Sequence, residues 1–265
     1  MEEPVLRPGA MPDPSLVQTL ETRLVNAWPA IETQIVDGWI VRFAKGYSKR
    51  ANSASPLAPG AALDDAAIGQ IVDQFAVHGL RPTFRLTGLE AADVDGRLAA
   101  RGFVEIEPTF GMVAPLWTLA TEPEVAVDPA VAIEPKPKAR WLKDVAAAYG
   151  GDKADHTRLT EIVQRIRQPA GFATLTLDDR PSAWGLAVVE RGFVGLFDIV
   201  VAPELRGLGL GKQIVCALAG WARKAGAEQA YLQVRAENEV ARDLYRALGF
   251  TDAYRYTHRV SPGPP

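Results

Sequence analysis

The sequence predicts an α/β fold of the α+β type, with a mixed, largely antiparallel sheet flanked by helices. Alternating apolar runs joined by tight turns predict β-hairpins. Amphipathic runs between such strands predict helices that cross the sheet, and hairpins joined to a crossover helix produce a mixed sheet. The chain has 265 residues, of which 48% are hydrophobic, enough for two domains of roughly 120–140 residues each.

The first half predicts helices and strands in alternation. Leu16, Leu20 and Leu24 recur every fourth residue and indicate a helix that ends near Pro29. A hairpin is expected over 33–43, because Asp37-Gly38 is a two-residue turn between two apolar runs. The remaining expectations are a loop at 52–60, a helix from 64 to Gly79, a strand at 81–87, a helix at 91–100 and a strand at 104–116.

Prolines at 123, 129, 135 and 137 interrupt the chain between 118 and 138, where no helical or strand periodicity is sustained. This stretch is interpreted as a linker. Beyond it the pattern predicts helices at 141–149 and 159–166, strands at 172–177, 182–191 and 194–201, a helix at 210–225, a strand at 231–234, a helix at 239–248 and a last strand from 250 through 256.

A glycine-rich turn lies between the strand that ends at Val201 and the helix that follows. It reads Arg206, Gly207, Leu208, Gly209, Leu210, Gly211 and Lys212. Such a turn directs backbone N–H groups and the helix dipole at one point, which favours a phosphate. A P-loop would need glycine at position 206 and Ser or Thr at position 213, where this chain has Arg206 and Gln213. A Rossmann loop would need glycine or alanine at position 212 or 214, where it has Lys212 and Ile214. Neither of these nucleotide-binding motifs is therefore present.

What remains is Arg-x-x-Gly-x-Gly after a strand, and a second motif accompanies it. Leu232-Gln233-Val234-Arg235-Ala236-Glu237-Asn238 is followed by Ala241 and by Leu244-Tyr245-Arg246-Ala247-Leu248-Gly249-Phe250. Together the two motifs resemble the GNAT N-acetyltransferase superfamily over 141–260. The resemblance implies a transferase, an acetyl-CoA-dependent N-acetyltransferase that passes an acetyl group directly to a primary amine.

The resemblance also implies roles for particular residues. The amides of the glycine loop would hold the pyrophosphate of acetyl-CoA. The edge formed by Ile199, Val200 and Val201 would pair with the pantetheine arm, and Asn238 would bond that arm. Tyr245 would act as the catalytic acid that protonates the departing thiolate.

One position departs from the family pattern. Many relatives carry an acidic residue where this chain has Gln233, and glutamine cannot serve as a base. Asp198, a carboxylate inside an apolar strand, is the first choice for the catalytic base, with Glu237 as the other nearby carboxylate. A structural role for Asp198 and a water chain to solvent both stay open. The alternatives to an enzyme are a non-catalytic acyl-CoA-binding module and an interaction protein that retains only the fold.

The two halves share a pattern. Leu98 to Phe103 followed by a strand parallels Tyr245 to Phe250 followed by a strand, and Leu98 stands where Tyr245 would be. We therefore expect a tandem arrangement: a degenerate GNAT-like domain at 1–120 that does not bind CoA, a linker at 121–138, and a catalytic GNAT domain at 139–265.

Composition limits the partners. The net charge of −3 and a pI near 5.7 argue against a nucleic-acid or membrane surface. A basic segment at 45–52 is either a pocket for an acidic ligand or, by preference, a solvated hairpin exit.

The single Cys216 and three histidines show no metal-ligand spacing, so no metal is expected. No signal peptide or membrane span is visible, which predicts a cytoplasmic protein. The acceptor is expected to be a small molecule or a protein amine, and the oligomeric state stays open.

Overall fold

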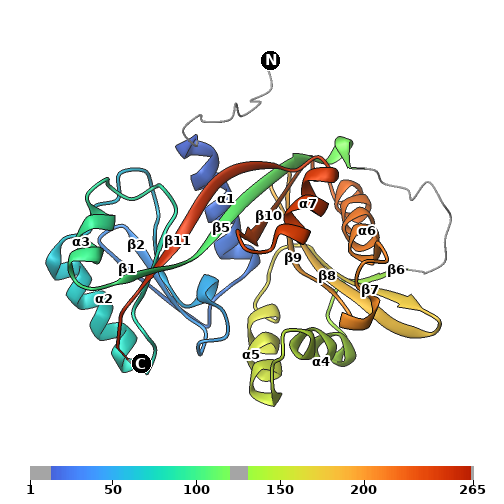
Figure 1. Cartoon of the computed structure of the whole chain (residues 1–265), viewed down its shortest axis with the longest axis horizontal. Coiled ribbons are helices and arrows are strands. Elements are labelled where there is room, and N and C mark those ends of the chain that lie inside the picture. The colour runs from blue at the N-terminus through green and yellow to red at the C-terminus, as the bar shows by residue number, and fades with distance from the viewer. Residues whose placement is uncertain (1–12, 120–130, 264–265) are drawn as a thin grey trace. The chain divides into compact units, whose positions relative to one another are not determined.

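The computed structural model describes residues 13–119 and 131–263 of the chain (Figure 1). The chain folds into two compact units. Unit 1 comprises residues 1–112, 234–238 and 251–265, and unit 2 comprises residues 113–233 and 239–250. Each unit therefore contains segments that are distant in the sequence.

Unit 1 is a sheet with helices packed on it. Its strands follow the order β1-β2-β3-β4-β11-β5. Its elements are α1 (Pro14–Ala27), β1 (Glu32–Val36), β2 (Trp39–Phe43), the 3-10 helix η1 (Lys49–Ala51), β3 (Ala54–Pro56), α2 (Asp65–Val77), β4 (Thr83–Leu86), α3 (Val94–Ala100), β5 (Val104–Pro115, in unit 1 up to Met112) and β11 (Thr251–Val260).

Local chemistry explains the first elements of unit 1. Helix α1 begins after Asp13, whose side chain accepts the Ser15 N–H at 2.9 Å, and Pro14 occupies the first helical position. The β1–β2 turn places Asp37 at φ 44° and Gly38 at φ 82°, the positive values that a two-residue hairpin turn requires. The predicted helix and hairpin are confirmed.

The last strand of the chain belongs to the core of unit 1. β11 pairs antiparallel with β4, from Thr257 opposite Leu86 to Val260 opposite Thr83, and Figure 1 shows it running beside β5. Its buried side chains include Tyr254 and Tyr256, each 4% exposed. Unit 1 is thus completed by residues that lie more than a hundred positions after its other strands.

Tyr254 and Tyr256 contact a buried ion pair. The Arg85 guanidinium donates to both carboxylate oxygens of Glu21, at 2.8 Å for Nη2 and Oε1, and the Tyr254 hydroxyl donates to Glu21 as well. The Arg85 guanidinium also lies 3.8 Å from the centre of the Tyr256 ring. Helix α1, strand β4 and strand β11 are therefore joined by charge-assisted bonds in a buried environment.

Replacing Glu21 with glutamine is expected to destabilise unit 1 by about 3–5 kcal/mol, because the charge of Arg85 would stay buried without its carboxylate. Chemical denaturation followed by tryptophan fluorescence measures the change, since Trp28 and Trp39 are buried in this unit. Asp93→Asn is the control: it breaks the exposed Asp93–Arg97 pair and should leave the midpoint unchanged. Equal midpoints for Glu21→Gln and wild type would contradict a stabilising role for the buried pair.

Unit 2 holds a second part of the sheet, in the order β10-β9-β8-β7-β6. β9 and β10 are parallel, whereas β6, β7, β8 and β9 pair antiparallel in succession. Its elements are η2 (Leu116–Thr118), β6 (Val131–Glu134), α4 (Ala139–Ala148), α5 (Lys153–Val163), β7 (Ala170–Leu177), β8 (Arg180–Glu190), β9 (Phe193–Val201), η3 (Pro203–Leu205), α6 (Leu210–Lys224), β10 (Gln229–Arg235, in unit 2 up to Gln233) and α7 (Glu239–Ala247). The predicted mixed, largely antiparallel sheet flanked by helices is confirmed.

Helices cover both faces of the unit 2 sheet. On β7, a side chain at Gly171 would meet Trp221 of α6, while the next residue, Phe172, packs edge-to-face on Trp141 of α4 at 5.1 Å between ring centres. Successive residues of a strand point to opposite faces. Helices α6 and α4 therefore lie on opposite sides of the sheet.

Two short strands were missed and one side chain was misplaced. The predicted loop at 52–60 contains β3, and the predicted linker contains β6 at its C-terminal end; residues 120–130 lie outside the described ones. Both strands have only three or four residues, too few for alternation to stand out. The four-residue spacing of Val240, Leu244 and Leu248 predicts that all three lie on the buried face of α7, but Val240 is 84% exposed.

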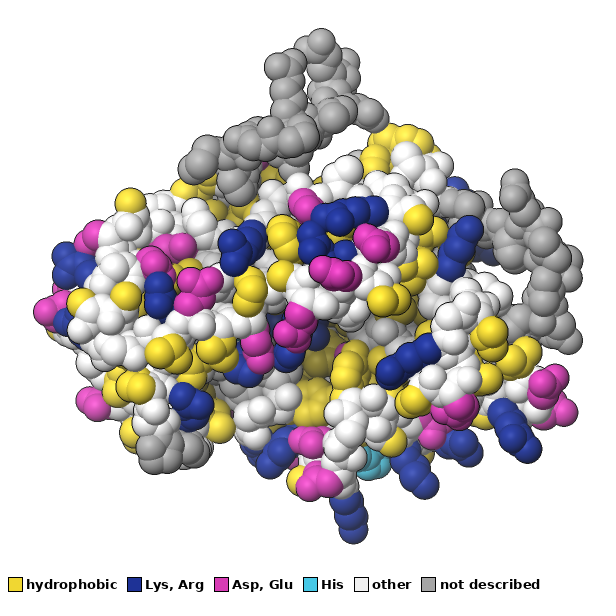
Figure 2. All heavy atoms as spheres, in the orientation of Figure 1, with side chains coloured by type: hydrophobic (Ala, Val, Ile, Leu, Met, Phe, Trp, Pro, Cys, Tyr) yellow, Lys and Arg dark blue, Asp and Glu magenta, His cyan; other side chains and the backbone are white. Residues whose placement is uncertain are grey.

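Acidic and basic side chains are interspersed over the face shown in Figure 2, in keeping with the small net charge. In the described part of the chain, no helix combines the length and apolarity needed to cross a membrane.

Candidate active site

Strand β9 carries a bulge at Asp198. Trp184 of β8 pairs with Val200, and Leu186 pairs with Phe197, so Asp198 and Ile199 together oppose the single residue between them, Gly185. Asp198 has φ 49°, a left-handed conformation that an extra residue in a strand can adopt. Gly185 is required here, because a Cβ would lie 2.7 Å from Ile214 and 2.9 Å from Ile199. The bulge bends β9 near its C-terminal end.

The pairing of β9 with β10 covers the start of the strand. It joins Phe193 through Leu196 to Gln229 through Leu232. Beyond the bulge, the described pairings of Val200 and Val201 are with Trp184 and Ala183 of β8. The other edge of Ile199–Val201 lies outside the β9–β10 ladder, so its backbone groups can pair with an extended ligand.

The glycine-rich loop connects β9 to α6. Gly207 has φ 82° and Gly209 φ 79°, and a Cβ on either would have no neighbour within 4 Å. Arg206, Leu208 and Lys212 are exposed. The loop is therefore open to solvent on the side of its glycines.

Helix α6 begins without a side-chain cap. Gly209 is the N-cap residue and offers no side chain to accept from the first turn. The first N–H groups of a helix have no acceptor within the helix, and among the described residues none is found for Leu210, Gly211 or Lys212. This end of α6 thus presents several N–H donors and the positive end of the helix dipole.

The loop, the end of β9 and helix α7 meet at Gly211. A Cβ built there would lie 3.4 Å from Leu244 and 3.7 Å from Val201. The structure thereby brings the predicted phosphate loop, the predicted pantetheine edge and the helix that carries Tyr245 together within unit 2.

Tyr245 is buried in α7, with 8% of its surface exposed and its ring 5.8 Å from that of Phe250. Burial raises the pKa of Tyr245 to about 12 because the phenolate would lose hydration. The phenol therefore stays protonated across the neutral range.

Asp198 is 7% exposed, and the Tyr149 hydroxyl donates to its Oδ1 at 3.4 Å. Tyr149 ends α4 and is 59% exposed. This contact was not predicted: a buried carboxylate calls for a partner, but nothing in the sequence connects positions 49 residues apart. Glu237, the other candidate base, is an exposed residue that pairs with Arg235 at 3.1 Å.

Asn238 lies in the part of the chain assigned to unit 1, in the exposed turn after β10, where its N–H donates to the Arg235 carbonyl at 3.1 Å.

The basic segment at 45–52 is an ordered turn in which the Asn52 side chain accepts the N–H groups of Ala44 and Gly46. Lys49 pairs with Glu107 at 2.9 Å.

Comparisons with known proteins place the chain in a family. The model of the family described as "Probable histone acetyltransferase Rv0428c C-terminal" matches residues 15–259. An uncharacterized N-acetyltransferase of Bacillus subtilis, YobR, is 27% identical over 244 residues, covering 92% of this chain and 98% of its own length.

Two solved structures share the fold. A GCN5-related N-acetyltransferase from Kribbella flavida has a TM-score of 0.68 at 18% identity, over 96% of this chain and 97% of its own. A tandem GNAT protein from the clavulanic acid biosynthesis pathway has a TM-score of 0.59 at 14% identity, over 97% and 90% of the two chains. With the family model spanning nearly the whole chain, the protein belongs to the GNAT N-acetyltransferases, in the family of the Rv0428c C-terminal region.

Proposed function

We propose that the protein transfers an acetyl group from acetyl-CoA directly to a primary amine. The observation that carries the proposal is the uncapped start of α6, joined by a glycine loop to the edge of β9 that lies outside the β9–β10 ladder. Donors that suit a pyrophosphate and an edge that suits an extended arm lie in succession, which fits the two chemical parts of CoA.

Different segments of the chain would bind the pyrophosphate and the pantetheine arm of acetyl-CoA. The amides of 207–212 would hold the pyrophosphate, with Arg206 and Lys212 adding exposed positive charge. The backbone of Ile199, Val200 and Val201 would pair with the pantetheine arm, and Asn238 would bond it. Acetyl-CoA, when bound, supplies an activated acetyl thioester.

Two side chains would carry out the proton transfers, Tyr245 as the acid and Asp198 as the base. As the C–N bond forms and the C–S bond breaks, Tyr245 would donate its proton to the leaving sulfur; its raised pKa keeps the hydroxyl protonated at neutral pH. Asp198 would accept the proton that the amine loses, directly or through water. Its burial, which disfavours a lone carboxylate, supports a role as base.

The two halves of the chain would have different tasks. We propose a tandem protein in which the first half is GNAT-like and does not catalyse. Leu98, the counterpart of Tyr245, is fully buried in α3, so that position offers no acid.

The proposed activity is tested by measuring free thiol released from acetyl-CoA in the presence of a panel of amines, with acetyl-CoA binding measured separately by calorimetry. Binding together with amine-dependent release supports the transferase. Binding without release for any amine would favour a non-catalytic acyl-CoA module, and absence of binding would reject both.

Gly209→Ala is expected to weaken acetyl-CoA binding about tenfold or more. Alanine is strained at φ 79°, so the backbone would shift and change the direction of the N–H groups in the first turn of α6. Gly192→Ala is the matched control. Gly192 turns β8 into β9 with φ 80°, and it too has no atom within 4 Å of a built Cβ.

Both substitutions should cost a similar stability of about 1–2 kcal/mol. Only Gly209→Ala should reduce the affinity measured by calorimetry. Equal affinities for the two variants would remove the loop from the binding site.

A further inference from the structure

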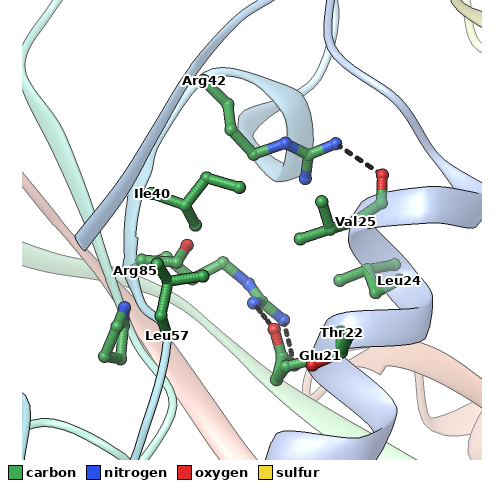
Figure 3. Close-up of a pocket in the computed structure, with 10 residues that line it drawn as sticks. Glu21, Thr22, Leu24, Val25, Ile40, Arg42, Leu57 and Arg85 are labelled. Atoms are coloured by element: carbon green, nitrogen blue, oxygen red, sulfur yellow. Dashed lines mark hydrogen bonds and ion pairs between the residues drawn. The ribbon is translucent and has the colours of Figure 1, made fainter. Parts of the chain in front are cut away.

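A small cavity lies inside unit 1. Figure 3 shows it between helix α1 and strands β2, β3 and β4. The side chains of Arg42 and Arg85 enter it from β2 and β4, and Glu21, Thr22 and Val25 line it from α1. Its volume is about 20 Å³, which corresponds to roughly one water-sized particle. A phosphate, a carboxylate metabolite or a nucleotide is too large for it.

Two cations lie at this cavity with one carboxylate. Arg42 and Arg85 are each only 2% exposed. Glu21 binds both terminal nitrogens of Arg85 and so offsets that charge. The partners of Arg42 are uncharged: its terminal nitrogens donate to the carbonyl oxygens of Arg50 at 2.7 Å, of Val25 at 3.4 Å and of Trp28.

The carbonyls that meet Arg42 offset only part of its charge. Val25 and Trp28 lie at the C-terminal end of α1, where the helix dipole amounts to about half a negative charge. Burial and the neighbouring Arg85 lower the pKa of Arg42 to about 9, which still leaves it protonated at neutral pH. A net positive charge therefore remains in an environment that disfavours one.

On each arginine the Nε–H group is buried and lacks a hydrogen-bond partner among the described residues. Buried donors are nearly always satisfied. A water molecule would accept these bonds, but it would bring no charge and would need acceptors for its own two hydrogens.

We propose that this cavity binds one small monovalent anion of the halide class, chloride in solution. A single chloride matches the volume, can accept from the unused Nε–H donors and neutralises the charge left by Arg42. It would stabilise the joint between α1 and strands β2 and β4, independently of the reaction proposed for unit 2.

The test uses the full-length wild-type protein in two measurements. Crystals grown in sodium bromide should show an anomalous peak in the cavity between the two guanidinium groups. The thermal midpoint should rise as chloride replaces gluconate at constant ionic strength, by about 3–6 °C at a tenfold excess over the dissociation constant, and should then keep rising with the logarithm of the chloride concentration. Density without an anomalous signal would identify water and overturn the proposal, as would a bromide peak with no change in the midpoint.

Arg42→Met removes one cation and its donor, so the chloride-dependent rise should disappear. Arg97→Met is the matched control, because Arg97 lies on the surface of α3 and does not line the cavity; it should keep the full rise. A rise that persists in Arg42→Met would reject the site. Should Arg42→Met fail to fold, the bromide crystals of the wild type decide the question alone.

Discussion

A chain that ends at Phe250 is expected to lose the fold of unit 1 although every residue of its first 112 positions is present. Removing β11 takes Tyr254, Tyr256, His258 and Val260 out of the core, each of them at most 4% exposed. Truncating one buried aromatic side chain typically costs about 3–5 kcal/mol. Two of them together reach the typical total stability of about 5–15 kcal/mol, and the buried Glu21–Arg85 pair would also lose its contacts with the two tyrosines.

Hydrogen exchange read by mass spectrometry measures this result. Peptides covering β2, β4 and α2 should exchange at the rate of an unfolded chain in the protein that ends at Phe250. The control is a chain that ends at Ser261, which keeps all of β11 together with the bond from the Ser261 N–H to the Pro82 carbonyl, and which should exchange like the full chain.

A synthetic peptide of residues 251–261, added to the shortened chain, should restore part of the protection by pairing with β4. Protection of unit 1 in the shortened chain without the peptide would show that β11 is dispensable, and would contradict its place in the core.

The helices and strands that could be predicted from the sequence are those specified by residues close together in the chain. The helix around Leu20 and the hairpin at Asp37-Gly38 are specified by residues within a few positions, through spacing, capping and turn conformation. The partner of β11 is not local. Its alternating residues predict a strand, but pairing with β4 is decided by contacts such as Tyr254 with Glu21, 233 positions apart.

The candidate site divides in the same way. The glycine loop is visible in the sequence because its conformation needs glycine at Gly207 and Gly209. Asp198 is visible as a carboxylate in an apolar strand. The bulge that changes its direction is not, because the bulge depends on the register of β9 against Gly185 in β8. The Tyr149 contact likewise depends on how α4 packs on the sheet.

Tyr245→Phe is expected to lower kcat by about 10²–10³-fold while leaving acetyl-CoA affinity nearly unchanged. Phenylalanine keeps the ring and its packing on Phe250 but cannot donate a proton to the leaving sulfur. A loss confined to kcat is the mark of an interaction made in the transition state and not on binding. Single-turnover measurements of thiol release, with calorimetry for affinity, separate the two effects.

The pH dependence gives a second readout of the same assignment. Because the pKa of Tyr245 is raised to about 12, the proton-donating form should be fully present below pH 10 and be lost only as the pH rises through about 12. Ionisation of Tyr245 should therefore cause no decrease in wild-type kcat between pH 8 and 10. Any decrease in that range should also be seen in Tyr245→Phe. Tyr231→Phe is the matched control, since it removes another buried phenol hydroxyl from unit 2, 3% exposed, and should leave the chemical rate unchanged. An unchanged single-turnover rate in Tyr245→Phe, or an equal loss in Tyr231→Phe, would reassign Tyr245 to packing and leave the departing sulfur to take its proton from solvent.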